Sequence, residues 1–257
     1  MLSTKSFVLA ALAAVASAAP GCAPPKATPT LPLTGGESEL PAAPSNMVLK
    51  KVILGHGIQN YTCSAEPAAT PTAKGALAVL YDITPLYPNG KPQSLSIEGF
   101  NALTSTVLWT EDLPLNLANP AAAVAGAVLS SKQYGATTSP WQSPKDLKLP
   151  NMAPIKYAGR HYFDASGTPN FDLTGPGNLK AHVVKKDGVA VPAGADKGPL
   201  KTGAVQWLLL GDSDLGISNG IKLVYRVVTA GGVAESCSTT GEGLSSVPYT
   251  AQYWFYG

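Results

Sequence analysis

Alternating hydrophobic and polar positions recur along most of the chain after residue 46 and predict a series of short β-strands. The segments with this pattern are residues 48–54, 58–63, 76–81, 105–110, 155–163, 180–185, 204–210, 221–229 and 248–256. β-Branched and aromatic residues are common in these segments, and Gly- and Asp-containing turns separate them. Short strands at irregular spacing predict a mostly-β fold, either a β-sandwich or a distorted barrel with long loops.

One segment predicts a short helix instead of a strand. Asn119 can cap it, Pro120 suits the first helical position, an alanine-rich run follows, and Gly135 can end it. An apolar loop is the alternative interpretation of the same residues. We therefore expect a single β-rich domain with one short helix.

The N-terminus has the three parts of a secretory signal peptide. Lys5 supplies a positive charge, residues 7–15 are apolar, and Ala16-Ser17-Ala18 matches the small residues that signal peptidase needs. The apolar run is too short to span a bilayer. We expect residues 1–18 to be a signal peptide, residues 19–45 a Pro-rich arm, and residues 46–257 the β-rich domain of a secreted, extracellular protein without a membrane anchor.

The composition fits an extracellular β fold. Charged residues make up only 13% of the chain, and 26 glycines and 23 prolines favour turns and loops. The 18 basic residues nearly balance the 16 acidic ones. No basic surface is therefore expected that would attract nucleic acid.

The cysteines predict one disulfide. Export favours oxidation of Cys22, Cys63 and Cys237 in pairs, so one of the three is left over. Cys22 lies in the Pro-rich arm, whereas the other two lie in segments that are expected to fold, which favours the pair Cys63–Cys237. A bridge that closes so long a loop contributes on the order of 4–5 kcal/mol by the chain-entropy argument.

Gly55-His56-Gly57 begins like a dinucleotide-binding fingerprint. Asn60 replaces the third glycine, and the following residues continue as a strand. A phosphate site needs a helix N-terminus at this point to supply N–H groups. We interpret the segment as a turn and expect no cofactor.

Ser213 follows a predicted strand, as the nucleophilic serine of some hydrolases does. Asp214 interrupts the hydrolase pattern, and no histidine follows, because the last one in the chain is His182. A serine without a positioned base is a weak nucleophile. A surface turn is the favoured interpretation, and no catalytic residue is assigned.

His161, Asp164 and Ser166 stand close together in the sequence. Neighbours on one strand point to alternate faces, so they are not expected to form a triad by themselves. The three histidines have no metal-ligand spacing, and we expect no metal site. The residues retained as a candidate ligand cluster are His56, His161, Tyr162 and Trp207, and a hydrogen-bonded structural histidine is the alternative.

Two surface features are further candidates. Asn60-Tyr61-Thr62 is an N-glycosylation sequon and predicts a glycan on Asn60 if that side chain faces solvent. Aromatic residues are dense toward the C-terminus, where most are expected in the core and an exposed subset would offer stacking surfaces for sugars. These aromatic residues are Trp207, Tyr249, Tyr253, Trp254, Phe255 and Tyr256.

Six segments in order carry a resemblance to a known family. They are residues 57–63 (GIQNYTC), 78–82 (AVLYD), 159–162 (GRHY), 205–210 (VQWLLL), 224–233 (VYRVVTAGGV, with Cys237 after it) and 248–256 (PYTAQYWFY). Together they resemble the secreted fungal and bacterial family of domain of unknown function 3455, over roughly residues 47–256.

The resemblance implies that Cys63 and Cys237 are the recurring cysteine pair of this family. Some fungal members carry a further cysteine where Thr84-Pro85 stand here, which explains why Cys22 lacks a partner. Fungal members often carry an automated malate dehydrogenase label, which the interrupted fingerprint at Gly55 and the signal peptide contradict. The family implies no substrate, cofactor or catalytic residue.

The sequence therefore favours a secreted, non-catalytic protein of a fungus that acts at the cell wall or at a host surface. Its expected partner is a wall or host-surface polysaccharide or protein. One alternative is a secreted hydrolase with a site around His161 and Asp164. A second alternative is a structural component of a wall or spore coat.

Overall fold

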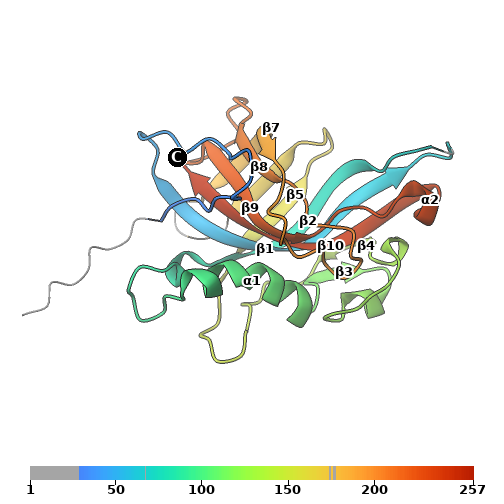
Figure 1. The fold of residues 1–257 in the computed structure, drawn as a ribbon, viewed down its shortest axis with the longest axis horizontal. Helices are drawn as coiled ribbons and strands as arrows, with labels where there is room; N and C mark the ends of the chain where they lie inside the picture. The colour runs from blue at the N-terminus through green and yellow to red at the C-terminus, as the bar shows by residue number, and fades with distance from the viewer. Residues whose placement is uncertain (1–28, 67, 174, 176–177) are drawn as a thin grey trace, which may run out of the picture.

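The computed structural model describes residues 29–257 except 67, 174 and 176–177 (Figure 1). Antiparallel strands close a barrel in which nearly every strand pairs with its neighbours in the sequence. Around the barrel, the order is β1 (Leu49–Cys63), β10 (Gly243–Tyr256), β9 (Leu223–Gly231), β8 (Trp207–Asp212), β7 (Lys180–Val189), β6 (Pro169–Leu173), β5 (Tyr157–Phe163) and β2 (Thr72–Asp82), which pairs again with β1. The mostly-β prediction is confirmed, and the barrel is the correct one of its two architectures.

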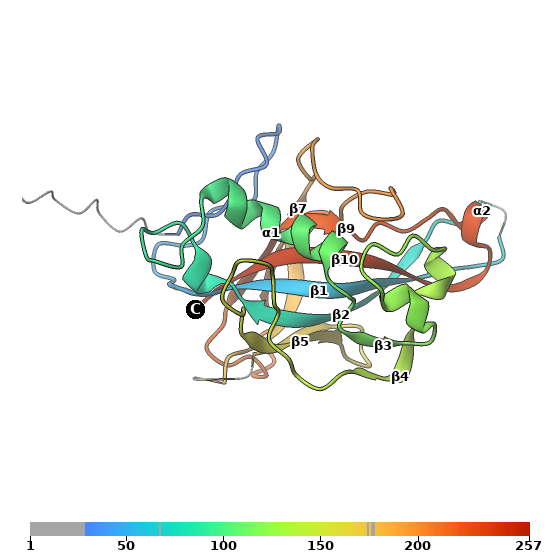
Figure 2. The ribbon, with the colours of Figure 1, turned by 90° about the horizontal axis from the view of Figure 1, so that it is seen from below.

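A long insertion between β2 and β5 covers one side of this barrel. It contains the helix α1 (Ile97–Thr110) and a separate two-stranded sheet of β3 (Leu115–Leu117) and β4 (Ala136–Trp141). The side chain of Ser96 caps α1 by accepting a hydrogen bond from the Gly99 amide at 3.1 Å. Figures 1 and 2 show α1 lying outside the barrel across β1 and β10.

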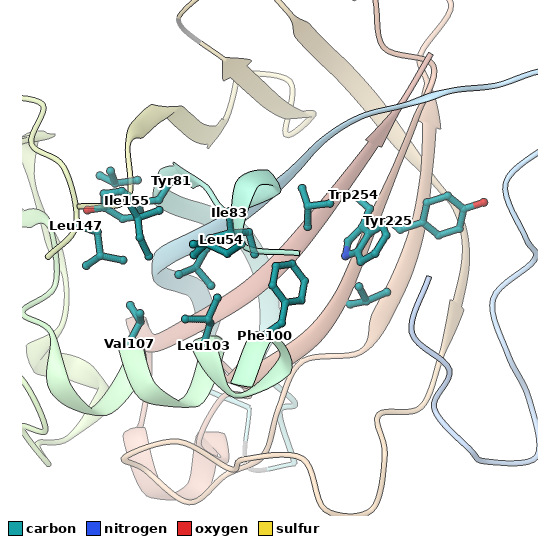
Figure 3. Close-up of a cluster of buried hydrophobic side chains, with 14 of the residues drawn as sticks. Leu54, Tyr81, Ile83, Phe100, Leu103, Val107, Leu147, Ile155, Tyr225 and Trp254 are labelled. Carbon is teal, nitrogen blue, oxygen red and sulfur yellow. The ribbon is translucent and has the colours of Figure 1, made fainter. Parts of the chain in front are cut away.

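The packing of α1 forms a core outside the barrel wall. Phe100, Leu103 and Val107 point from the helix toward Leu54 and Trp254 on the strands (Figure 3). All of these side chains are at most 3% exposed, so the helix is fixed by burial of apolar surface.

Hydrogen bonds between side chains of β10 and the backbone of α1 reinforce this contact. The Thr250 hydroxyl donates to the Thr104 carbonyl at 2.7 Å, and the Gln252 amide donates to the Phe100 carbonyl at 3.1 Å. These two buried polar residues are therefore satisfied within the outer core.

Inside the barrel, small and large residues alternate so that the bulky rings fit. A Cβ on Gly55 would lie 2.6 Å from the Tyr253 ring, and one on Gly57 would lie 1.9 Å from the Leu77 carbonyl oxygen. Both glycines are therefore required by close packing in the middle of a continuous strand. The expected turn at this motif is wrong, because β1 runs without a break from Leu49 to Cys63.

The described part of the N-terminal arm lies on the outer core. Leu31, Leu40 and Ala43 pack against it, and the Tyr225 hydroxyl donates to the Pro41 carbonyl at 3.0 Å. The expected signal peptide and Cys22 lie outside the described residues.

The disulfide Cys63–Cys237 is confirmed, with an S–S distance of 2.06 Å. It joins the end of β1 to the short helix α2 (Cys237–Thr240), which precedes β10. Among the described residues, no helix is long and apolar enough to cross a membrane.

Two expectations about local structure are wrong. Residues 105–110, expected as a strand, form the second half of α1, because their apolar side chains complete a helical face with Phe100 and Leu103. The helix expected after Asn119 is only a 3₁₀ turn, Pro120–Ala123, capped by the Asn119 side chain at 3.2 Å. Cap and proline are present, but the run beyond them includes Gly126 with φ of 67°, a backbone conformation that no right-handed helix contains.

Candidate functional site

The four residues of the expected ligand cluster lie on different faces of the barrel wall. His56 and Trp207 lie on the outer face, where His56 is 1% exposed among the residues of the outer core. Tyr162 is also on the outer face but is half-buried at the surface of β5, whereas His161 points into the barrel. The structure therefore does not bring these residues together in one site.

His161 has a structural environment inside the barrel. Its ring stacks on Phe171 with a centroid distance of 4.0 Å, and its Nδ1 lies 2.8 Å from the Asn170 carbonyl oxygen. Burial lowers the pKa of His161 to about 4, so the ring is neutral near pH 7 and Nδ1–H donates to this carbonyl. Burial likewise lowers the pKa of His56 to about 3.

Asp164 is bonded to a different histidine, His182 on β7. The Nε2 atom of His182 lies 3.0 Å from the Asp164 carboxylate, and its Nδ1 atom lies 2.6 Å from the hydroxyl of Ser213. The order Ser–His–Asp is that of a catalytic triad, but the two ring nitrogens are exchanged, because Ser213 is on Nδ1 and Asp164 on Nε2. The sequence argument that no histidine follows Ser213 missed this contact, because the antiparallel pairing of β7 with β8 places an earlier histidine beside the serine.

The electrostatics fix the proton positions along this chain. Hydrogen bonds from Ser166, Thr168 and His182 hold the pKa of Asp164 well below its usual range, so the carboxylate is ionised. It accepts Nε2–H from His182, which leaves Nδ1 to accept the Ser213 hydroxyl proton. The serine is thus polarised toward a base.

An oxyanion-binding pair of amides is not free at Ser213. The Ser213 amide donates to the His182 carbonyl at 3.0 Å, and the Asp214 amide donates to the Asp212 carboxylate at 3.3 Å. Acyl-transfer enzymes leave such amides unpaired to bind the developing oxyanion. In this conformation, the hydrogen bonds between Asp164, His182 and Ser213 are best explained as a polar network that connects the β5–β6 turn to the segment after β8.

Two adjoining hollows, of about 760 and 660 Å³, lie outside the barrel at β5. Pro144, Tyr157 and Arg160 line both of them, so together they form one groove, here called the outer groove. It is lined by the outer face of β5, by the loop that follows β4 and by the end of α1. Figure 2 shows that loop running past β5.

Aromatic and hydrogen-bonding side chains alternate in the outer groove. Tyr157, Arg160 and Tyr162 share the outer face of β5, and the guanidinium of Arg160 lies 5.0 Å from the centroid of the Trp141 ring. The rings of Trp141, Tyr157 and Tyr162 are half-buried. Asp172 on β6 lies opposite Arg160 of β5 in the strand register, and it adds an exposed carboxylate.

Of these rings, the sequence analysis names only Tyr162, as part of the candidate ligand cluster. Trp141 comes from β4, which belongs to the inserted sheet and not to the barrel. The available signal was the outward spacing of Arg160 and Tyr162 along a strand whose inward position is His161.

The aromatic residues near the C-terminus do not form a sugar-binding surface. Trp207, Tyr249, Tyr253, Trp254, Phe255 and Tyr256 are all at most 7% exposed. The expectation of an exposed subset is wrong, because α1 and the N-terminal arm cover the outer face of β10 and the barrel encloses its inner face.

Neither a metal site nor a glycan is established. In the part of the chain that the structure describes, no three His, Cys, Asp or Glu side chains group closely enough to hold a metal ion. Asn60 is half-buried, and its side-chain oxygen accepts a hydrogen bond from Ser246 at 2.8 Å. Glycosylation of Asn60 stays a prediction.

Comparison with known proteins gives one match. The family model described as "Protein of unknown function (DUF3455)" matches residues 44–257, which is most of the chain. No curated protein and no solved structure matches.

Proposed function

Because this chain belongs to the family of unknown function DUF3455, whose description names no activity, we propose a function from its own geometry: an exported, non-catalytic protein that binds a cell-wall or host-surface polysaccharide through the outer groove. Export is supported by the signal-like N-terminus and by the disulfide, since such bridges persist in oxidising compartments.

The row of half-buried rings in the outer groove is the observation that carries this proposal. Sugars present apolar C–H faces that stack on aromatic rings, and hydroxyl groups that pair with charged and amide side chains. Trp141, Tyr157 and Tyr162 offer the first kind of contact, and Arg160 and Asp172 offer the second.

Retention on insoluble polymers tests the proposal. The protein is incubated with chitin, β-glucan, cellulose and plant-wall material, and the bound fraction is measured. We expect retention on at least one polymer, and loss of most of it in Trp141→Ala and Tyr162→Ala. Trp109→Ala is the matched control, because Trp109 is an exposed ring outside the groove. Retention on none of the polymers refutes polysaccharide binding. Full retention by both groove variants would mean that the polysaccharide binds outside the outer groove.

The Asp164–His182–Ser213 chain favours a second candidate function, a secreted hydrolase. In this alternative, the catalytic residue is Ser213 and its base is His182, not His161. The reaction requires the segment after β8 to move, because the nearest amides are engaged in hydrogen bonds.

Labelling with a fluorophosphonate probe decides this alternative. Covalent modification that is absent in Ser213→Ala and in His182→Gln supports the hydrolase. Ser139→Ala is the control, because Ser139 is an exposed serine of β4 outside the Asp164–His182–Ser213 network. If Ser213 is not labelled, the hydrolase alternative is refuted and the Asp164–His182–Ser213 network has a structural role.

A further inference from the structure

One end of the barrel interior is hollow. The bulky inward residues fill the middle of the barrel, and beyond them a space of about 780 Å³ opens at the end that carries the β1–β2 connection, the right side of Figure 1. We call this space the barrel mouth. Its lining residues come from β1, β2, β7, β8 and β9 and from the β5–β6 turn.

The walls of the barrel mouth are largely apolar. Phe163, Val205, Leu208, Leu210 and Val233 contribute most of this surface. A concave apolar wall of this size is typical of a site for a small organic molecule, and eight-stranded barrels have an interior wide enough to hold one.

Every charged side chain that lines the barrel mouth is positive. They are Lys74, Lys185 and Arg226, and no Asp or Glu of the described residues lines this space. Arg226 donates from Nε and Nη2 to the Gln206 carbonyl at 3.1 and 2.9 Å, and it takes part in no salt bridge among the described residues. Burial raises the pKa of Tyr61 and lowers that of His161, and the positive charge of Arg226 acts on both groups in the lowering direction, so its field reaches the interior of the barrel.

An unpaired hydrogen-bond donor lies in the same wall. The side chain of Gln59 is 7% exposed, lines the mouth, and its amide nitrogen Nε2 is buried without a hydrogen-bond partner. A buried donor without an acceptor costs about 1–3 kcal/mol, which native proteins rarely tolerate without a reason. Nε2 itself is buried beneath the lining, so an acceptor on a bound molecule removes this cost once the Gln59 amide turns toward the mouth.

We propose that the barrel mouth binds a small organic acid with an apolar body, whose carboxylate accepts hydrogen bonds from Gln59 and is attracted by Arg226. The apolar body lies against Phe163 and the leucines of β8. The positive charges of Lys74, Lys185 and Arg226 repel cationic molecules. This site is separate from the outer groove, so the inference goes beyond polysaccharide binding and does not depend on it.

Titration calorimetry with decanoate tests the proposal on the full secreted chain. Decanol and decylammonium serve as neutral and cationic probes with the same apolar body. We expect decanoate to bind at least tenfold more tightly than decanol and decylammonium not to bind. A charged hydrogen bond of typical strength corresponds to about a tenfold change in Kd, so Gln59→Leu and Arg226→Met should each weaken decanoate binding about tenfold or more.

Lys186→Met provides the matched control. Lys186 neighbours the mouth-lining Lys185 on β7 but does not line the space, so its removal should leave the Kd for decanoate unchanged. Tyr162→Ala should also leave it unchanged, which separates this site from the outer groove. The proposal is refuted if none of the three probes binds, if decylammonium binds as well as decanoate, or if Arg226→Met binds decanoate like the unaltered protein.

Discussion

The two faces of the barrel wall are packed in different ways. The outer face beneath α1 is continuous: Phe100, Leu103 and Val107 meet the strands, and side chains of β10 satisfy the helix carbonyls. The inner face holds a stacked histidine and a pair of hydrogen-bonded tyrosines, and it ends in the hollow barrel mouth. Among the described residues, each face buries a donor without a partner, Trp207 Nε1 outside and Gln59 Nε2 inside, so the hollow is what distinguishes the inner face. This difference indicates that the outer core supplies stability, while part of the interior is left unfilled for another purpose.

The largest expected effect comes from truncating the outer core. Phe100→Ala removes a fully buried ring that contacts Tyr87 edge-to-face at 5.4 Å, and we expect it to lower the free energy of unfolding by about 3–5 kcal/mol. Denaturant titration measures this. Leu244→Ala is the control, because Leu244 is 72% exposed and should change stability by less than about 0.5 kcal/mol. A small effect at Phe100 would mean that α1 is not needed to hold the barrel.

An intermediate effect is expected on acidification, because burial lowers the pKa of His56 on the outer face and of His161 on the inner face. The folded protein keeps His56 and His161 unprotonated until the pH reaches about 3 and about 4, whereas the unfolded chain protonates them near 6.5. Protons therefore favour the unfolded chain, and the free energy of unfolding should fall by roughly 2 kcal/mol per histidine between pH 7 and pH 5. Carboxylates with lowered pKa act only below about 4, outside this interval.

Comparing variants at both pH values assigns this loss to the two faces. His161→Phe preserves the stack on Phe171, and His56→Leu keeps an apolar side chain under α1; each should remove about half of the difference between pH 7 and pH 5. An unchanged pH difference in either variant contradicts the assignment for that face.

The smallest expected effect has the opposite sign. Gln59→Leu replaces the unpaired amide of the barrel mouth by an apolar group, and we expect it to raise the free energy of unfolding by about 1 kcal/mol. Denaturant titration without any ligand measures the change. A lower free energy of unfolding instead would show that the packing of the Gln59 side chain contributes more to stability than its unpaired amide costs.

Much of the fold followed from local patterns, but the site did not. β2, β5, β7 and β9 were located from their alternation, and the disulfide from the position of its cysteines. α1 was missed because its periodic apolar residues have β-branched and aromatic neighbours, which favour strands in isolation. The expected ligand cluster is wrong because His161 and Tyr162 are adjacent on one strand, and their side chains therefore lie on opposite faces of the barrel wall.

The sequence by itself indicated a β-rich body and favoured a crosslink between Cys63 and Cys237, because strand alternation is a local pattern and only these two of the three cysteines lie in segments that are expected to fold. Only the tertiary structure decided that the strands close into a barrel, that His182 lies beside Ser213, and that Gln59 and Arg226 share a hollow. Those relations depend on strand register and barrel closure, which arise from contacts between residues far apart in the chain.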